Sequence, residues 1–439
     1  MTALLIIPIL AILILVHELG HFVTARLVGI KVEEFGIGIP PRLWGFKRNG
    51  IIYSINLIPL GGFVRVLGED GHSFEPGSMQ SKSRLQRTAF IVAGSFMNVV
   101  LAFALMIAVV GIQGQAPTNV YVAQIQPNSP AQHVGWQPGD RFVSVAGQPV
   151  TSVNQIISET EKYAGKPMPV VLLRHGQTIT SSVVPRVSPP PGSGRVGMLI
   201  QGAPAATLTV QSVKAGSPAA AAGVRVGDTL QSLDGQPLAD ASAYSLTLQG
   251  LTGKTVPLVV RRDGRLLTVQ LAVPTVTPAQ GDVTTGVTIR PDVQYQRLPL
   301  SQIVPQGVGQ TVDTLQQMVQ GLAAMVHSGV GLSGITGPIG MGQLTSEVLA
   351  ASAAPAWVTL ANLMVLLSLN LAILNLLPFP ALDGGRLLFV VVEFIRGKRV
   401  SPEKEGLVHF VGLVILLGFM FVVAFVDINR IMSGQSLLH

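Results

Sequence analysis

Four stretches of the chain are apolar over the length that a lipid bilayer requires. Residues 1–28 contain only two charged residues, Glu18 and Arg26. The other three runs have no Asp, Glu, Lys or Arg, and they cover residues 88–112, 355–382 and 406–426. Because a spanning helix needs about 20 apolar residues, the pattern predicts four transmembrane helices. The first run lacks a positively charged start and a small-residue cleavage site, so we expect a retained span rather than a signal peptide.

The polar block between the second and third runs repeats itself. The matching segments are 88 positions apart: Ser129-Pro130-Ala131 with Ser217-Pro218-Ala219, Gly139-Asp140 with Gly227-Asp228, and Arg174-x-Gly176 with Arg262-x-Gly264. A fixed offset indicates a duplicated unit, and two copies are too few for a solenoid. Strand-like runs around the helix-like stretch 153–163 predict that each copy is a small α+β domain.

The composition supports a membrane protein. Of 439 residues, 48% are hydrophobic and only 12% are charged, against about 25% charged in an average soluble domain. A large soluble enzyme with four buried core helices would need more polar sequence to cover them. The chain has no cysteine, which excludes disulfide scaffolds, thiolate zinc sites and cysteine nucleophiles.

The net charge of +7 follows from the placement of the basic residues. Eight Lys and Arg lie between the first two apolar runs, and five lie between the last two. The central block 113–354 carries 14 basic and 11 acidic residues. The positive-inside rule places the two basic loops in the cytoplasm and the central block and both termini outside. The charge therefore reflects topology, and we expect no nucleic-acid partner.

The first apolar run contains the motif His17-Glu18-Leu19-Gly20-His21. On a helix the two histidines are four residues apart, so both imidazoles face one side and can share a metal ion, while Glu18 can reach a metal-bound water. A carboxylate inside a span costs about 2.5 kcal/mol or more unless it has a partner or a function. The alternative is a purely structural polar network.

A hydrolytic zinc site usually has three protein ligands and one open position. His409, inside the fourth run, is one candidate for the third ligand, although a lone histidine in an apolar helix is more often packed. Asp383 is the better candidate, because it follows the third run, where Pro378 and Pro380 interrupt the helix. Irregular backbone at membrane depth is tolerated where it lines a polar cavity. The alternative for Asp383 is an ordinary aspartate at a helix end.

These motifs together resemble the site-2 protease family of intramembrane zinc metalloproteases, in particular its bacterial branch of regulator-of-sigma-E proteases. The resemblance rests on the HExxH motif in the first span, on N-x-x-P-x-x-x-x-D-G from Asn375 in the third, and on repeats similar to bacterial PDZ domains between them. It covers almost the whole chain. It implies a multi-pass α-helical membrane protein with four transmembrane helices, a cytoplasmic membrane-reentrant β-hairpin and two inserted extracytoplasmic PDZ domains.

Shorter segments also resemble that family. Residues 35–45 are similar to a family loop, and residues 51–66, with Gly61-Gly62-Phe63, are similar to its reentrant hairpin. Gly337-Pro338-Ile339-Gly340 is similar to a segment that precedes the third span. By the resemblance, Asn375, Pro378 and the segment Gly61-Gly62-Phe63 bind substrate, although Asn375 can also be a helix cap. Residues 51–57 are expected to be an edge strand that holds an extended substrate.

The PDZ resemblance assigns peptide binding to two further residues. Gly197 and Gly286 would approach the carboxylate of a peptide through backbone N–H groups, as in strand addition to a sheet edge. The alternative is that these glycines only make turns. Two domains of this size beside the membrane would also exclude a bulky substrate ectodomain, so we expect them to act mainly as a size filter. The Gly- and Pro-rich segment 188–194 would let the pair reposition.

The resemblance further implies a mechanism, substrates and a location. Zn²⁺ is held by His17, His21 and Asp383, and Glu18 is the general base. The substrates are transmembrane segments, including those of single-pass anti-sigma factors already trimmed outside and of remnant signal peptides. We expect a monomer in the bacterial inner membrane, in contact with the lipid bilayer. A metal transporter and an inactive PDZ scaffold are the alternatives, and neither would need Glu18.

The predicted layout divides the chain into eight segments. They are a first span with HExxH (1–30), a cytoplasmic loop with the reentrant hairpin (31–87), a second span (88–112), two PDZ domains (118–190 and 205–290), a juxtamembrane amphipathic segment (298–350), a third span with the NxxPxxxxDG motif (355–382) and a fourth span (406–428).

The basic loops generate a topology prediction. Reporter fusions after Lys47 or Lys398 should report a cytoplasmic location, and fusions near Gly192 or at His439 should report the outside, because short basic loops stay on the cytoplasmic side. Labelling from outside intact cells of a cysteine placed at Asn49 would overturn this arrangement.

Overall fold

The computed structural model describes residues 2–69, 73–190, 193–275, 285–293, 295–328, 337–352 and 354–433. It forms two compact units. The first unit combines Met1–Ile112 with Leu298–His439, and the second is Gln113–Arg297. The second unit is therefore an insertion in the first, and each is described separately.

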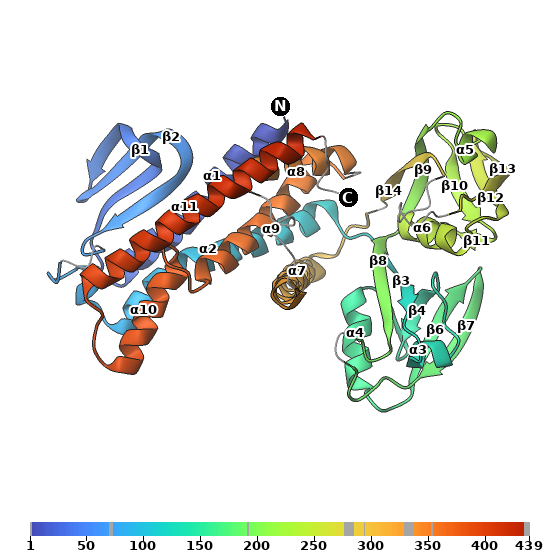
Figure 1. Ribbon diagram of the computed structural model, residues 1–439, viewed down its shortest axis with the longest axis horizontal. Coiled ribbons are helices and arrows are strands. Elements are labelled where there is room, and N and C mark those ends of the chain that lie inside the picture. Colours follow the sequence, from blue (N-terminus) through green and yellow to red (C-terminus); the bar gives the residue numbers. More distant parts are fainter. Residues whose placement is uncertain are drawn as a thin grey trace. The chain divides into compact units, whose positions relative to one another are not determined.

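The first unit contains the four long apolar helices. Its elements are η1 (Thr2–Leu5), α1 (Ile6–Leu27), β1 (Val32–Arg48), β2 (Ile51–Val66), η2 (Met79–Ser81), α2 (Arg84–Gln113), α7 (Leu300–Ser328), α8 (Pro338–Ala351), α9 (Ala356–Leu376), α10 (Asp383–Arg396) and α11 (Pro402–Met432). Four stretches are long and apolar enough to cross a membrane: Thr2–Leu27, α2, α9 and α11. The prediction of four long apolar helices is thereby confirmed, and Figure 1 shows them running alongside one another.

Apolar side chains hold these helices together. Leu13 of α1 is fully buried in a cluster that includes Leu363 and Leu367 of α9. A second cluster joins α2, α7 and α9 around Leu369. At the same depth the Ser368 hydroxyl of α9 donates a hydrogen bond of 2.8 Å to the backbone oxygen of Asn98 in α2. Helices α1, α2 and α9 therefore meet at a common buried level.

The Gly337–Gly340 segment begins α8 and is anchored on α11. The backbone N–H groups of Gly337 and Gly340 donate to one carboxylate oxygen of Asp427, at 3.1 and 2.9 Å. Asp427 is fully buried. A carboxylate at a helix N-terminus satisfies free N–H groups and lies at the positive end of the helix dipole. This contact is a structural reason for the Gly-Pro-x-Gly sequence.

The β1–β2 sheet corrects one detail of the sequence analysis. Residues 51–66 form a single strand, β2, and its partner is β1 rather than a second half of the same segment. Residues 34–37 of β1 have partners on both sides, at residues 52–55 and 62–65, and residues 51–56 also pair with residues 42–48. The expectation of an edge strand at residues 51–57 is therefore wrong, because residues 52–55 pair on two sides. The free edge beside α1 is residues 62–66.

The far part of this sheet exposes a group of large apolar side chains. They are Ile37, Ile39, Leu43, Trp44, Phe46, Ile55, Leu57 and Ile58. Large exposed apolar patches mark sites that contact a membrane or a partner. The sheet lies at the same end of the helix bundle as α10 (Figure 1).

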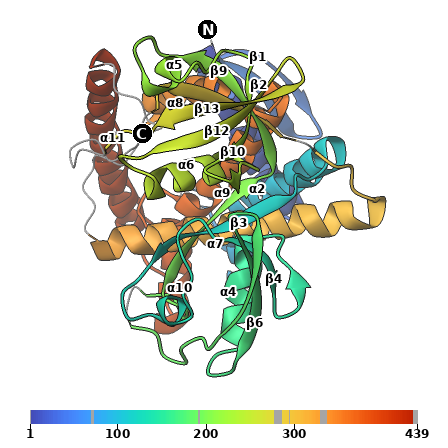
Figure 2. The same cartoon turned by 90° about the vertical axis from the view of Figure 1, so that its right-hand side faces the viewer.

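The second unit consists of two similar sheets. The first has the strand order β7-β6-β4-β3-β8 and the second has the order β13-β12-β10-β9-β14, with β5 and β11 paired to β4 and β10. The strands are β3 (Thr118–Ile125), β4 (Arg141–Val145), β5 (Gln148–Pro149), β6 (Met168–Arg174), β7 (Gln177–Val183), β8 (Met198–Pro204), β9 (Ala206–Val213), β10 (Thr229–Leu233), β11 (Gln236–Pro237), β12 (Thr255–Arg262), β13 (Arg265–Ala272) and β14 (Val287–Val293). The helices are α3 (Pro130–His133), α4 (Val153–Lys162), α5 (Pro218–Ala221) and α6 (Ala241–Gly250). Figure 2 shows the two lobes.

The 88-residue repeat extends to individual hydrogen bonds. In the first lobe the Arg174 guanidinium binds the buried carboxylate of Asp140 at 2.6 Å and the backbone oxygen of Gly135 at 2.9 Å. In the second lobe Arg262 binds Asp228 and Gly223 in the same way, both at 2.7 Å. Burial disfavours ionisation of Asp228, but the hydrogen bond and the charge of Arg262 outweigh it, so the pKa of Asp228 lies below its ordinary value.

The junction of the two lobes differs from the expected flexible link. β8, at residues 198–204, belongs to the first sheet, so this lobe extends beyond the predicted end at residue 190. The described residues of the expected link, 188–190 and 193–194, therefore precede β8 within the first lobe, and only Ala205 separates β8 from β9. Asp240, which caps α6, accepts hydrogen bonds from Tyr121 (2.7 Å) and Asn119 (2.8 Å) of β3. Because this carboxylate is buried, it ties the two lobes together.

Candidate metal centre

Helix α1 carries both histidines of the HExxH motif on its buried face. His17 and His21 are 6% and 7% exposed, and their Nε2 atoms are 3.2 Å apart. Glu18, one residue further along the helix than His17, lines the cavity beside them. The i, i+4 spacing thus places the two imidazole rings together as the sequence predicts.

Asp383 reaches the same point from the other end of the chain. Its Oδ2 atom lies 3.1 Å from Nε2 of His17 and 3.4 Å from Nε2 of His21. Asp383 is the first residue of α10, directly after the loop 377–382. The following residue must be glycine, because a Cβ at position 384 would overlap the backbone oxygens of Leu376 and Leu377. The turn that delivers Asp383 therefore depends on the Asp-Gly pair of the motif.

These three atoms suit a divalent metal ion. One ligand atom from each of His17, His21 and Asp383 lies within 4.8 Å of the others. A tetrahedral zinc ion with bonds of about 2.0–2.2 Å places its ligand atoms about 3.3–3.6 Å apart, close to the observed spacing. Nδ1 of His21 is 2.9 Å from the backbone oxygen of Phe90. That oxygen can only accept, so Nδ1 carries the proton and Nε2 of the neutral ring presents a lone pair toward Asp383.

Helix α2 forms the wall behind the two imidazoles. A Cβ at Gly94 would overlap Nε2 of both His17 and His21. A Cβ at Gly20 would likewise overlap the backbone oxygen of Ala93. Glycine at these two positions therefore allows α1 and α2 to approach closely enough for the rings to lie against bare backbone.

A cavity of about 190 Å³ opens beside the three ligand atoms. Phe63 and Val64, on the free edge of β2, line it opposite Ile91 of α2. Glu18 lines the same cavity as Val64. The expected substrate-contact segment Gly61–Phe63 thus lies along α1, with Gly61 against Ile14 and Gly62 against Glu18.

Comparison with known proteins agrees with this geometry. The pattern of peptidase family M50 matches residues 5–419. The chain belongs to peptidase family M50. It is 30% identical to the regulator of sigma-E protease RseP of Escherichia coli K12, over 96% of this chain and 97% of that protein. It is also 30% identical to the zinc metalloprotease RasP of Geobacillus kaustophilus, over 95% of each.

A third relative is the regulator of sigma-W protease RasP of Bacillus subtilis 168, at 28% identity over 95% of this chain and 96% of that protein. The predicted family, the predicted class of zinc metalloprotease and the predicted zinc cofactor are thereby confirmed. The comparisons assign no role to individual residues.

His409, the rival third ligand, has another contact in this M50 peptidase. Its Nδ1 atom accepts a hydrogen bond of 2.9 Å from the backbone N–H of Ala381, in the loop before Asp383. Ala381 has a left-handed backbone conformation, with φ of 77°. His409 therefore holds the loop rather than joining the three ligand atoms.

The remaining predicted substrate residues lie elsewhere. Asn375 is half-buried in the last turn of α9, and its side chain has no hydrogen bond to the part of the chain that the structure describes. Pro378 is exposed in the loop 377–382. Gly197 and Gly286 precede β8 and β14, and a Cβ at either would overlap the Cβ of Ser129 or Ser217. Both glycines have a left-handed backbone, with φ of 71° and 80°, and close packing also leaves no room for a side chain.

Sequence analysis missed two charged residues in the active-site cavity. Arg386 and Glu69 line it and form an ion pair of 2.6 Å. Arg386 follows Asp383 by three residues on α10, so helical spacing was the available signal. Glu69 lies just after β2 and gave no signal of its own.

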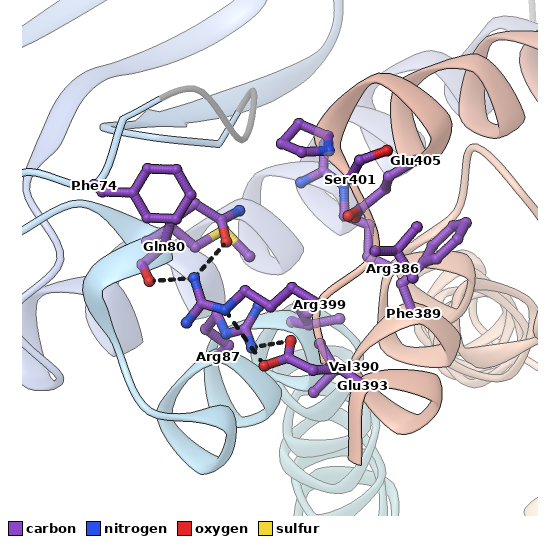
Figure 3. Close-up of a pocket in the computed structure, with 14 residues that line it drawn as sticks. Phe74, Gln80, Arg87, Arg386, Phe389, Val390, Glu393, Arg399, Ser401 and Glu405 are labelled. Carbon is purple, nitrogen blue, oxygen red and sulfur yellow. Dashed lines mark hydrogen bonds and ion pairs between the residues drawn. The ribbon is translucent and has the colours of Figure 1, made fainter. Parts of the chain in front are cut away.

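A cluster of arginines around Glu393 attaches α10 to α2 (Figure 3). The buried carboxylate of Glu393 pairs with Arg87, with Arg84 at 3.2 Å and with Arg399 at 3.4 Å. Arg399 also donates to the backbone oxygen of Gln80 at 2.8 Å. Burial disfavours ionisation of Glu393, but the hydrogen bond and charge of Arg87, with those of Arg84 and Arg399, outweigh it and lower its pKa. The cluster lines a cavity of about 240 Å³.

This arginine cluster generates a prediction about the stability of α10, the helix that begins with Asp383. Replacing Glu393 by Gln leaves Arg87 buried without its counter-charge, a defect that costs about 3–5 kcal/mol when a buried pair is broken. We expect backbone hydrogen exchange in residues 383–396 of the intact protein to become at least tenfold faster.

The exposed Glu403→Gln serves as the matched control and should leave that exchange unchanged. Because the lowered pKa keeps Glu393 ionised, the wild-type rate, corrected for intrinsic exchange, should not vary between about pH 5 and 8. Unchanged exchange in Glu393→Gln would show that the cluster does not hold α10.

Proposed function

We propose that this chain is an intramembrane protease whose zinc ion is held by His17, His21 and Asp383. The observation that carries this proposal is the convergence of their three ligand atoms beside Glu18, between helices long and apolar enough to span a bilayer. His21 is six residues before the end of α1, which at 1.5 Å per residue is about 9 Å inside that end. A cut at this depth falls within the membrane rather than in the solvent.

The residues around the cavity support separate roles for the zinc ion and for Glu18. Zinc, when bound, supplies a Lewis acid for the scissile carbonyl and lowers the pKa of a water molecule. The Glu18 carboxylate accepts the proton of the attacking water and passes it to the leaving amine nitrogen. The Glu18 side chain lies against Gly62 of β2 and lines the cavity.

The free edge of β2 is the place where an extended substrate can bind. A helix uses its own backbone N–H and C=O groups, so a transmembrane substrate must unwind before its peptide bond is accessible. Residues 62–66 pair with β1 on one side only, and Phe63 and Val64 line the cavity. An unwound segment added to this edge would recover backbone hydrogen bonds within reach of Glu18. The exposed apolar group on the same sheet suits insertion into lipid.

The substrates follow from the relatives and from the position of the site. Two relatives carry the names regulator of sigma-E protease RseP and regulator of sigma-W protease RasP. These names support membrane-bound anti-sigma factors as substrates, with remnant signal peptides as a second group. The basic residues of 31–87 and 383–405 support an active-site end in the cytoplasmic half of the inner membrane. The inserted unit and both termini then lie outside.

The two lobes of the second unit have the features of PDZ domains. In each lobe a strand at the sheet edge, β8 or β14, lies beside a helix, α4 or α6. The grooves between them have volumes of about 540 and 640 Å³. An open edge beside a helix suits a peptide added as a strand. Each lobe is also large, since a 100-residue domain has a radius of gyration of about 13 Å, so the pair acts mainly as a size filter.

The catalytic roles predict two different losses. His17→Ala, His21→Ala and Asp383→Ala should lose zinc and activity together, because each removes a ligand atom. Glu18→Gln should keep zinc but lose at least 100-fold in cleavage, because it removes only the base. Metal analysis and cleavage of a tagged single-span substrate by the purified proteins measure both.

The Glu18→Gln variant decides the proposal. Cleavage at a near wild-type rate would exclude the metalloprotease mechanism. A transporter would keep metal transport in this variant, and an inactive scaffold would keep its peptide binding.

The size filter predicts the effect of removing the inserted unit. Gln115 and Gln296 hydrogen-bond to each other at 3.0 Å in both directions, so a short Gly-Ser linker can replace residues 118–293 between them. The wild type should cleave a transmembrane segment with a short ectodomain and spare one with a full ectodomain. The shortened protein should cleave both, because the steric barrier is gone.

Arginine substitutions on the exposed groove residues Ile157 and Ser245 test peptide capture separately. They fill the grooves without touching Gly197 or Gly286, whose replacement would disturb packing. The filter requires the double variant to cleave the short substrate normally. If it does not, or if the shortened protein still discriminates, peptide recognition is the better account.

A further inference from the structure

One buried amide of α2 contacts the imidazole of His17 on the side away from the metal centre. Asn98 is fully buried, and its Nδ2 atom is 3.4 Å from Nδ1 of His17. Its Oδ1 atom is also buried and has no hydrogen-bond partner in the described part of the chain. An unpartnered carbonyl oxygen at such a depth costs about 1–3 kcal/mol.

One rotation of the amide pairs its oxygen with the ring of His17 and moves the NH2 group to the place that Oδ1 held. The oxygen and nitrogen of an asparagine side chain exchange places when the amide turns by 180°, with almost no change in shape. Oδ1 then faces Nδ1 of His17 and accepts a hydrogen bond from the proton that Nδ1 carries. In that tautomer Nε2 of His17 has a lone pair directed at Asp383 and His21, as a metal ligand requires.

The contact completes a pattern along α2. His21 already donates from Nδ1 to the backbone oxygen of Phe90 at 2.9 Å. Phe90, Gly94 and Asn98 are spaced by four residues, so they lie on one face of α2. Phe90 contacts Nδ1 of His21, and Asn98 contacts Nδ1 of His17. Gly94, between them, leaves room for both rings.

The position of Asn98 is itself constrained. Its backbone oxygen accepts the hydrogen bond from Ser368 of α9. Asn98 therefore lies where α1, α2 and α9 meet, and its side chain is directed at His17 rather than at solvent or lipid.

We propose that Asn98 is a positioning residue that selects the Nδ1-protonated tautomer of His17 and so aims Nε2 at the zinc ion. This inference rests on the proposed role of His17 as a ligand. Hydrogen bonds to the far nitrogen of a ligand histidine orient the ring, and their loss typically weakens metal binding by 10- to 100-fold.

Zinc affinity of the purified full-length protein tests this role. The metal is removed and then titrated back against a chromophoric chelator. Asn98→Leu, which keeps the volume but loses the acceptor, should weaken zinc binding by 10- to 100-fold. Asn98→Asp, which keeps an acceptor oxygen, should stay within about threefold of the wild type. Ser368→Ala, the matched control, removes a hydrogen bond to the same residue but not to the ring and should also stay within threefold.

Activity at saturating zinc separates positioning from catalysis. Because Asn98 touches neither substrate nor the reacting atoms, kcat of Asn98→Leu should recover to near the wild-type value once the metal site is filled. Zinc binding by Asn98→Leu at wild-type strength would overturn the inference. If Asn98→Leu does not fold, a tenfold or greater loss in Asn98→Asp overturns it, since that variant retains the acceptor.

The same titration tells this inference apart from the proposed function. If His17→Ala loses zinc while Asn98→Leu does not, the ligand set stands and only the role of Asn98 fails. If His17→Ala binds zinc as the wild type does, the proposed metal centre itself is wrong.

Discussion

The structure depends on three acceptor atoms held together inside an apolar helix bundle. Nε2 of His17, Nε2 of His21 and Oδ2 of Asp383 lie 3.1–3.4 Å apart. Lone pairs at that distance repel one another, and the repulsion is stronger in a low-dielectric interior than in water. A divalent cation converts this repulsion into attraction. The surrounding elements serve to keep the three atoms in place.

Each ligand is held by contacts outside the cluster. The backbone of Phe90 orients His21, and glycine at position 94 gives both rings room against α2. Asp383 is delivered by a loop that His409 holds at Ala381, and α10 is fastened to α2 through Glu393. Residues from α1, α2 and α11 thus take part, although among the described long apolar helices only α1 carries candidate ligands.

Backbone hydrogen bonding sets the second constraint on the site. Inside a bilayer every unpaired N–H group is costly, so an open strand edge must have a partner. Among the described residues, 62–66 pair with β1 on one side, and the other side stays open to an extended chain. Glu18 lies against Gly62 on this edge. The proposed general base and the proposed substrate-binding edge are therefore neighbours, which relates substrate entry to the position of the carboxylate.

The sequence by itself determined the features that depend on local spacing and on the bilayer. Apolar run length predicts the four helices, the i, i+4 spacing predicts that His17 and His21 share a face, and the 88-residue offset predicts two similar lobes. Proline at 378 and 380 predicts the interruption before Asp383. Each of these follows from neighbours along the chain, so no tertiary information is needed.

Only the tertiary structure decided which distant groups meet. Pairing of residues 52–55 on both sides depends on how β1 folds across β2, which periodicity does not reveal. The contacts of Asn98, Glu393 and Asp240 join elements 80 to 310 residues apart or lobes with separate cores. A single polar residue in an apolar run, or an acid on an amphipathic helix, carries no signal of its partner. The partner becomes visible once the chain has folded, because burial makes an unpaired polar group costly.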